Sequence, residues 1–109
     1  MTTKRRRARL ARAARLFHVL GHDVRIDLVE LMGLTPDVNW TTKDLAEHVV
    51  MNQTNLYHHV HLLEESGLIV VAATRRVNGI IEKQYCASPQ LAKGYAALLD
   101  AIRRVDVNV

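Results

Sequence analysis

The stretch that decides the fold is residues 41–67, which read TTKDLAEHVVMNQTNLYHHVHLLEESG. Thr41, followed three residues later by Asp44, is typical of a helix that begins with a hydroxyl cap. After a short turn, Asn52 can cap a second helix, which Gly67 can end. This second helix repeats apolar residues four and three positions apart, namely Leu56, Val60 and Leu63. Two short helices joined by a tight turn predict a helix-turn-helix motif.

Two β-prone runs follow the motif, residues 68–73 and residues 80–86, with a polar segment over 74–79 between them. The polar segment ends in Asn78-Gly79, and both of these residues accept a positive φ. Asn-Gly between two β-prone runs is the strongest short signal of a β-hairpin. A hairpin directly after a helix-turn-helix predicts a wing.

Helices are expected on both sides of this central region. Residues 3–20 are strong helix formers, and a second helix then extends to Gly33. Residues 38–40 predict a very short strand. Ser88-Pro89 opens a final helix, because a cap followed by proline is typical of a helix start. The predicted fold class is therefore α+β, a winged helix-turn-helix with additional N- and C-terminal helices.

Both terminal helices carry apolar residues at helical spacing. The predicted interface residues are Leu10 and Phe17 in the first helix and Leu91, Tyr95, Leu98 and Ile102 in the last. A lone domain of this length has no reason to expose two such stripes, so they predict that the chain forms a homodimer. The expected organisation is a basic arm over 1–15, a winged helix-turn-helix domain over 16–87 and a dimerisation helix over 88–109.

The composition is that of one ordinary globular domain, with 109 residues, of which 49% are hydrophobic and 24% charged. There is no run of about 18 uncharged apolar residues, so no membrane span is expected. Arginines interrupt the start of the chain, which argues against a signal peptide and favours a cytoplasmic protein. The lone Cys86 excludes an internal disulfide and a multi-cysteine zinc site.

The net charge of +4 is unevenly distributed along the chain. Residues 1–15 hold seven Lys/Arg and no Asp/Glu, whereas residues 16–109 hold eight Lys/Arg and eleven Asp/Glu, a net charge of −3. A concentrated basic end favours a polyanionic partner, nucleic acid before membrane, because no large apolar face accompanies it. The alternative is a solvated helix end, and the charge alone favours neither.

The order of these predicted elements resembles the ArsR-type winged-helix transcriptional regulators. The matching segments are residues 20–25, 42–47 and 56–69, together with Asn78-Gly79 and Glu82-Lys83. The resemblance covers about residues 16–87 and implies a dimeric DNA-binding repressor or activator whose interface pairs the first and last helices. Well-known members sense metals through cysteines near the start of the third helix. Residues 41–45 contain none, so thiolate sensing is not expected there.

Val50 departs from the resemblance, because the turn of such motifs usually places glycine at this position. A β-branched residue disfavours a positive φ. The turn is therefore either strained or takes another form.

Six polar side chains of the second motif helix are expected to face away from its apolar side and to contact DNA: Gln53, Thr54, Asn55, Tyr57, His58 and His61. The amides of Gln53 and Asn55 suit adenine, and Thr54 suits a phosphate or a thymine methyl group. Arg75 and Arg76 on the wing suit phosphates or a narrow minor groove. The simpler alternatives are a solvated helix face and an ordinary charged loop.

The histidines predict no metal site. His18 with His22, and His58 with His61, could each share a helix face, but Gly21 is expected to break the helix between the first two, and two imidazoles alone make an incomplete zinc site. His59 lies next to the apolar side of its helix and is expected to pack as a core residue. No metal and no other cofactor is expected.

The predicted function is sequence-specific regulation of transcription by a homodimer on a pseudo-palindromic operator in double-stranded DNA. Two alternatives stay open: an architectural protein that binds DNA without sequence preference, and a winged-helix adaptor that contacts proteins instead. The net charge of −3 over 16–109 keeps the adaptor open. The sequence has no phosphate-binding glycine loop, nucleophile elbow or paired-carboxylate cleft, so enzymatic activity is not expected. The residues point to no particular effector ligand.

Overall fold

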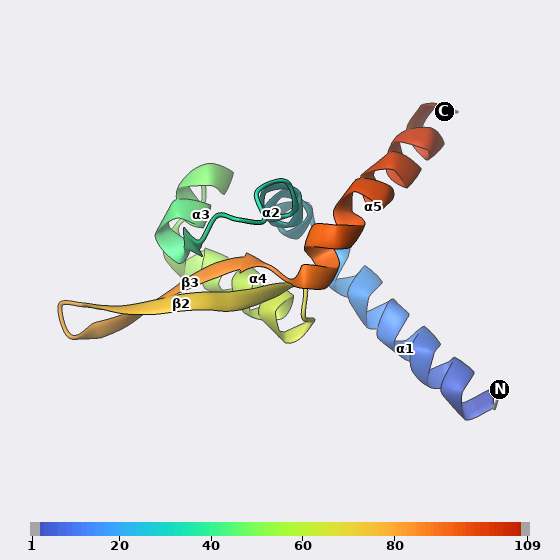
Figure 1. The fold of residues 1–109 in the computed structure, drawn as a ribbon, viewed down its shortest axis with the longest axis horizontal. Coiled ribbons are helices and arrows are strands. Elements are labelled where there is room, and N and C mark those ends of the chain that lie inside the picture. Colours follow the sequence, from blue (N-terminus) through green and yellow to red (C-terminus); the bar gives the residue numbers. More distant parts are fainter. Residues whose placement is uncertain (1–2, 108–109) are drawn as a thin grey trace.

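The computed structural model describes residues 3–107, so residues 1–2 of the predicted arm and 108–109 of the predicted final helix lie outside it. Its elements in chain order are α1 (Thr3–Leu20), α2 (Asp23–Leu34), β1 (Trp40–Thr41), α3 (Thr42–Val49), α4 (Gln53–Glu65), β2 (Ile69–Val77), β3 (Ile80–Ala87) and α5 (Pro89–Val107). Helices α3 and α4 form the helix-turn-helix, and β2 and β3 form the wing (Figure 1). The predicted α+β winged helix-turn-helix is confirmed.

Polar side chains cap the two motif helices at the predicted positions. The Thr41 hydroxyl accepts a hydrogen bond from the Asp44 backbone N–H at 3.1 Å, where α3 begins. The Asn52 side chain accepts one from the Asn55 backbone N–H at 2.8 Å, where α4 begins. Each bond satisfies a donor that the helix itself cannot pair, which is why these residues fix the helix starts.

The wing is longer than the sequence predicted. Its ladder continues to the pair Val77–Ile80, so the turn is only Asn78-Gly79, with φ of 51° and 79°. The predicted turn at Asn78-Gly79 is confirmed, but residues 74–77, which the sequence placed between the two β-prone runs, belong to β2. A two-residue turn with two positive φ angles matches the twist of the strands, and pairing therefore continues to the tip.

The short first strand completes an antiparallel sheet in the order β1-β3-β2. Trp40 pairs with Tyr85 of β3. The strand begins later than the predicted residues 38–40, because the Val38 N–H donates a hydrogen bond to the Thr35 carbonyl at 3.0 Å and belongs to the turn after α2.

The core lies between α2, the helix-turn-helix, the sheet and the first turns of α5. Its fully buried side chains include Leu28, Met32, Leu45, Leu56, Leu63 and Ile69. The predicted inward side of α4, Leu56, Val60 and Leu63, is buried as expected. Burying one large aliphatic side chain stabilises a fold by about 1.5–3 kcal/mol. This side of α4 therefore packs in the core, and the opposite side is available to solvent or a partner.

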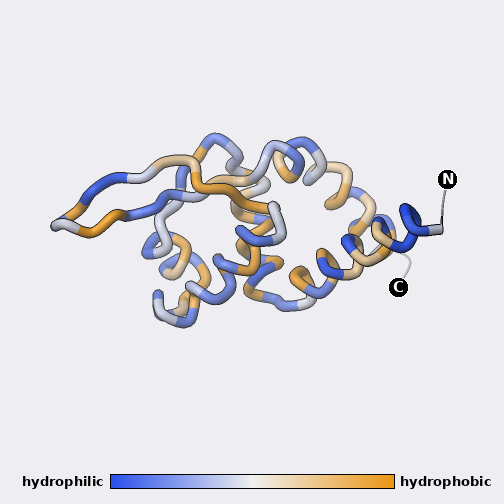
Figure 2. Tube along the Cα trace, turned by 90° about the horizontal axis from the view of Figure 1, so that it is seen from below, coloured by the Kyte–Doolittle hydropathy of each residue, from blue (hydrophilic) through white to orange (hydrophobic). Residues whose placement is uncertain are grey.

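The two terminal helices project from this core. Their free ends lie on the side of the molecule opposite to the wing in both views (Figures 1 and 2). Within the described part of α1, Val19 is the buried residue. Among residues 3–107, no helix combines the length and the apolar content that crossing a membrane requires.

Candidate nucleic-acid interface

Helix α4 presents all six predicted DNA-contacting side chains on its exposed side. These residues are Gln53, Thr54, Asn55, Tyr57, His58 and His61. They are exposed because the apolar residues of α4 occupy the other side of the helix and are buried in the core. A helix with this polarity can pack on its own domain with one side and enter a groove of DNA with the other.

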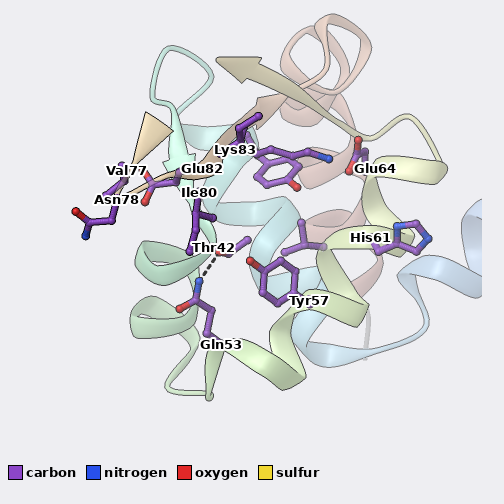
Figure 3. A pocket seen from close by; sticks show the side chains of 13 residues that line it. Thr42, Gln53, Tyr57, His61, Glu64, Val77, Asn78, Ile80, Glu82 and Lys83 are labelled. Atoms are coloured by element: carbon purple, nitrogen blue, oxygen red, sulfur yellow. Dashed lines mark hydrogen bonds between the residues drawn. The ribbon is translucent and has the colours of Figure 1, made fainter. Parts of the chain in front are cut away.

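Gln53, at the start of α4, is tied to α3. Its side-chain amide donates a hydrogen bond to the Thr42 hydroxyl at 2.7 Å, and Thr42 is itself buried (Figure 3). One amide N–H and the amide carbonyl remain for a partner. The bond holds the start of α4 against α3. Sequence reasoning missed this role, because the two residues lie in different helices and no local pattern joins them.

Two other polar residues of α4 differ in how free their side chains are. The His61 ring nitrogen Nε2 lies 3.0 Å from a carboxylate oxygen of Glu65, one turn further along the helix. Asn55 gives its backbone N–H to the cap, but within residues 3–107 its side chain forms no hydrogen bond. Asn55 can therefore offer both a donor and an acceptor to a base edge. A contact between His61 and DNA would compete with Glu65.

The wing carries Arg75 and Arg76 in its distal half. Arg75 Nε lies 2.8 Å from Glu82 Oε1, and these two residues are directly opposite each other in the ladder. Arg76 lies opposite Ile81 and is exposed. The charge of Arg75 is thus partly neutralised. This ion pair was not predicted from the sequence, although a two-residue turn sets the register that brings positions 75 and 82 together.

A groove of about 490 Å³ lies between α4 and the wing. Its lining includes Tyr57, His61 and Glu64 from α4 and Ile80, Ile81 and Lys83 from β3 (Figure 3). Apolar, aromatic, cationic and anionic groups are mixed in it. Because α4 and the wing border the same groove, one extended partner can contact both.

A buried arginine and histidine support α4 from behind. His59 is 9% exposed, and its Nδ1 lies 3.3 Å from Nη1 of Arg25, which is 7% exposed. The Arg25 Nε–H also donates to the Val19 carbonyl at the end of α1, and the His22 ring lies 4.6 Å from the His59 ring, centroid to centroid. These contacts join α1, α2 and α4, which confirms the core role predicted for His59. Sequence reasoning missed Arg25, since an arginine in a helix is usually exposed.

The described residues contain no group of three His, Cys, Asp or Glu side chains placed to hold a metal ion. The α1 helix ends at Leu20, so His18 and His22 are not on one continuous helix. His22 instead caps α2, where its Nδ1 accepts a hydrogen bond from the Val24 backbone N–H at 3.2 Å.

The predicted interface residues separate into two groups. Leu10, Phe17, Leu98 and Ile102 are exposed. Leu91 and Tyr95 are 6% and 7% exposed within the single chain, so their placement at a dimer interface is corrected: they belong to the core. The reason is that the first turns of α5 pack on α2, where the Tyr95 ring lies against Gly33.

Residues 20–72 match the family model of a helix-turn-helix domain. No curated protein sequence matches the chain. The family match spans α2, β1, both motif helices and the start of the wing.

Solved structures extend the likeness to nearly the whole chain. Mb0332 from Mycobacterium bovis (fragment 1–100), a homodimeric winged helix-turn-helix DNA-binding domain and possible ArsR-family transcriptional regulator, is 19% identical with a TM-score of 0.71, covering 97% of this chain and 91% of its own. NolR from Sinorhizobium fredii is 19% identical with a TM-score of 0.68, covering 93% of each chain. The transcriptional repressor BigR from Xylella fastidiosa is 25% identical with a TM-score of 0.63, covering 92% of each chain.

Proposed function

We propose that this chain is an ArsR-type winged helix-turn-helix protein that binds double-stranded DNA as a homodimer. In this proposal it regulates transcription from a pseudo-palindromic operator. The fold is that of DNA-binding transcriptional regulators. The observation that carries the proposal is that the exposed polar side of α4 and the wing border one groove. A duplex that receives α4 in its major groove also meets the wing.

Base reading is assigned to the N-terminal half of α4. The free amide of Asn55 matches the donor and acceptor of adenine N6 and N7, and one good bidentate contact contributes about 1–3 kcal/mol of discrimination. Thr54, beside it, suits a phosphate or a thymine methyl group. Arg76 and Lys83 on the wing suit phosphates, because neither is in an ion pair with a described acidic residue. Phosphate contacts position the protein, and base contacts specify the site.

The second copy of the chain is expected to pack on the exposed parts of α1 and α5. Leu10 and Phe17 on α1 and Leu98 and Ile102 on α5 expose apolar side chains that such pairing would bury. A two-fold dimer presents two α4 helices to half-sites one helical turn apart, about 34–36 Å. The two-fold symmetry of the protein is the reason to expect an inverted repeat in the DNA.

Selection of bound sites from a randomised duplex pool tests this function, followed by titrations with the selected site and with random duplex at two salt concentrations. We expect an inverted repeat to emerge. Asn55→Ala should weaken binding to the selected site by about 1–3 kcal/mol and relax the preference at one base pair per half-site. Asn39→Ala, which changes an exposed asparagine outside the helix-turn-helix and the wing, is the matched control and should bind normally.

The same titrations discriminate the alternatives. Equal affinity for selected and random duplex, with a strong dependence on salt, would indicate an architectural DNA-binding protein. Absence of binding to either duplex at low salt would overturn the proposal and favour the adaptor.

A further inference from the structure

We infer that the tip of the wing is an apolar wedge that enters the minor groove of the bound duplex and bends it. This inference rests on the proposed function and adds a deformation of the DNA to it. The wedge consists of Ile80 and Ile81, supported by Val77 across the turn. Apolar side chains that insert between base steps from the minor groove bend DNA by about 20–90°.

The exposure of these side chains is the first observation. Ile80 is 72% exposed and Ile81 is 61% exposed, and Val77 opposite Ile80 is also exposed. Figure 2 shows the apolar colouring at the end of the hairpin, far from the core. The turn of Asn78-Gly79 keeps both strands paired up to the tip, so the two isoleucines stand on a firm projection rather than on a loose loop.

The position of the tip is the second observation. Ile80 and Ile81 line the same groove as Tyr57 and His61 of α4, so the wedge continues the surface that is proposed to bind DNA. The free ends of α1 and α5 lie on the opposite side of the molecule (Figure 1). A homodimer formed through those helices therefore leaves the tip uncovered.

The charges around the tip favour DNA as the occupant. Arg76 lies directly opposite Ile81, and Arg75 and Lys83 lie one and two residue pairs further from the tip; Glu82 is the acidic residue among them and is bonded to Arg75. Apolar side chains surrounded by cationic ones fit the minor groove of DNA, because its edges are lined by phosphates and its interior by bases and sugars. A hydrophobic protein surface would not need the surrounding cations.

With such a wedge, the affinity for DNA also depends on base pairs to which the protein forms no hydrogen bonds. Pyrimidine–purine steps such as TA and CA/TG are unstacked most easily. We expect such a step in the minor groove flanking each half-site. Specificity there comes from the low cost of deformation rather than from hydrogen bonds to bases.

The test measures DNA bending by the protein of residues 1–109. A duplex carrying the selected site is labelled at its two ends for energy transfer, and 2-aminopurine is placed at the flanking step. Ile80→Thr with Ile81→Thr removes the apolar ends but keeps β-branched residues that suit a strand. Val70→Thr, an exposed strand residue at the base of the wing, is the matched control.

Binding of the unmodified protein and of the control should raise both energy transfer and 2-aminopurine fluorescence. The double variant should bind with about tenfold lower affinity and should leave both signals near those of free DNA. The wedge inference would be overturned if the unmodified protein bound DNA without bending it, or if the double variant bent DNA as much as the unmodified protein does. Either result would leave the proposed function intact. A double variant that changes sedimentation but not bending would identify the tip as a protein contact. Absence of any DNA binding would instead count against the proposed function.

Discussion

Val50 is the residue at which the local rules of conformation and the structure disagree most. Its backbone is left-handed, with φ of 54° and ψ of 56°, at the end of α3. A left-handed conformation costs an L-residue about 1–2 kcal/mol. The side chain is 91% exposed, so burial does not offset that cost. Of the two forms that the sequence left open for this turn, the strained one is found.

Val50→Gly is expected to stabilise the fold. Glycine adopts the left-handed conformation without strain, although its flexibility in the unfolded chain removes part of the gain. The expected net gain is about 0.5–1 kcal/mol, and about 4–8 °C of melting temperature corresponds to each kcal/mol in a domain of this size. Thermal unfolding at one fixed protein concentration measures it.

Asn78→Gly is the matched comparison for this variant. Asn78 also has a positive φ, but asparagine tolerates that conformation, so its replacement should gain less. A lower melting temperature for Val50→Gly than for the unmodified protein would show that the valine side chain contributes something that its exposure does not reveal.

His59 is expected to make the stability depend on pH. Because Nδ1 accepts a hydrogen bond from the permanently charged Arg25, that nitrogen is unprotonated in the fold. Burial lowers the pKa of His59 below its ordinary value of 6.5, and His22, Arg25 and His58 lower it further, whereas Asp23 raises it. The folded state therefore takes up a proton at this site less readily than the unfolded chain.

The free energy of unfolding should consequently fall as the pH decreases through 6.5, and this contribution should level off below the lowered pKa of the fold. His59→Asn keeps an acceptor atom towards Arg25 and removes the titration. Urea unfolding at a series of pH values should show a shallower loss of stability in acid for the variant. Parallel pH profiles for the two proteins would contradict the assignment.

His59 illustrates which contacts of a buried side chain one sequence can reveal and which it cannot. The burial of His59 follows from its place beside the apolar side of α4, which is a local pattern. Its bond to Arg25 does not, because the two residues are 34 positions apart and only the packing of α2 against α4 brings them together. The same holds for Gln53 and Thr42.

Among the elements, α2 and α5 meet at a contact that leaves no room for a side chain. A Cβ atom added to Gly33 would lie 2.8 Å from Cγ of Tyr95. Neither residue can be recognised as a contact from the sequence. Leu91 and Tyr95 repeat at the same helical spacing as Leu98, so the pattern does not distinguish burial in the chain's own core from burial against a second copy.

Gly33→Ala is expected to destabilise the protein by about 1–3 kcal/mol, because the added methyl group overpacks the contact and displaces the Tyr95 ring. Chemical denaturation measures the change. Gly94→Ala is the matched control. A Cβ at Gly94 would meet nothing within 4 Å, and alanine is about 1 kcal/mol better than glycine in a helix. Opposite signs for the two variants are expected, and two stabilising changes would show that α2 and α5 are not in close contact.

Short-range signals explain why other elements were predictable. The caps at Thr41 and Asn52 and the Asn78-Gly79 turn each depend on a few neighbouring residues, and all three are found where the sequence placed them. The length of the wing strands was not predictable in the same way. Pairing with the opposite strand, rather than the intrinsic preference of residues 74–77, decides where they end.

Exposed apolar surface is distributed unevenly over the whole molecule, and part of it lies on the two terminal helices. The core side of the helix-turn-helix is closed, whereas Leu10 and Phe17 on α1 and Leu98 and Ile102 on α5 remain exposed on the projecting helices. The overall dimensions of 52 × 36 × 25 Å reflect this extended shape. Helices that expose apolar side chains away from their own core are typical of an interface between subunits.

Leu98→Asp is expected to convert a dimer into a monomer. Leu98 is 43% exposed in the single chain, so the substitution leaves the protomer's core intact, but a carboxylate there would be buried without a partner when two copies meet. Sedimentation at about 10–50 μM should give a dimer for the unmodified protein and a monomer for the variant, since association follows mass action. Val38→Asp, at an exposed apolar residue in the loop before β1, should remain dimeric.

The effect on DNA connects this prediction to the function. A monomer still presents α4 and the wing, so Leu98→Asp should retain binding to a single half-site. It should lose the additional affinity that the unmodified protein gains on the inverted repeat, because linking two binding surfaces raises the effective concentration of the second. A variant that is monomeric yet binds the full repeat as tightly as the unmodified protein would separate DNA recognition from dimerisation. If the unmodified protein sediments as a monomer, the exposed apolar residues of α1 and α5 do not form a dimer interface. They then give no reason to expect a symmetric operator.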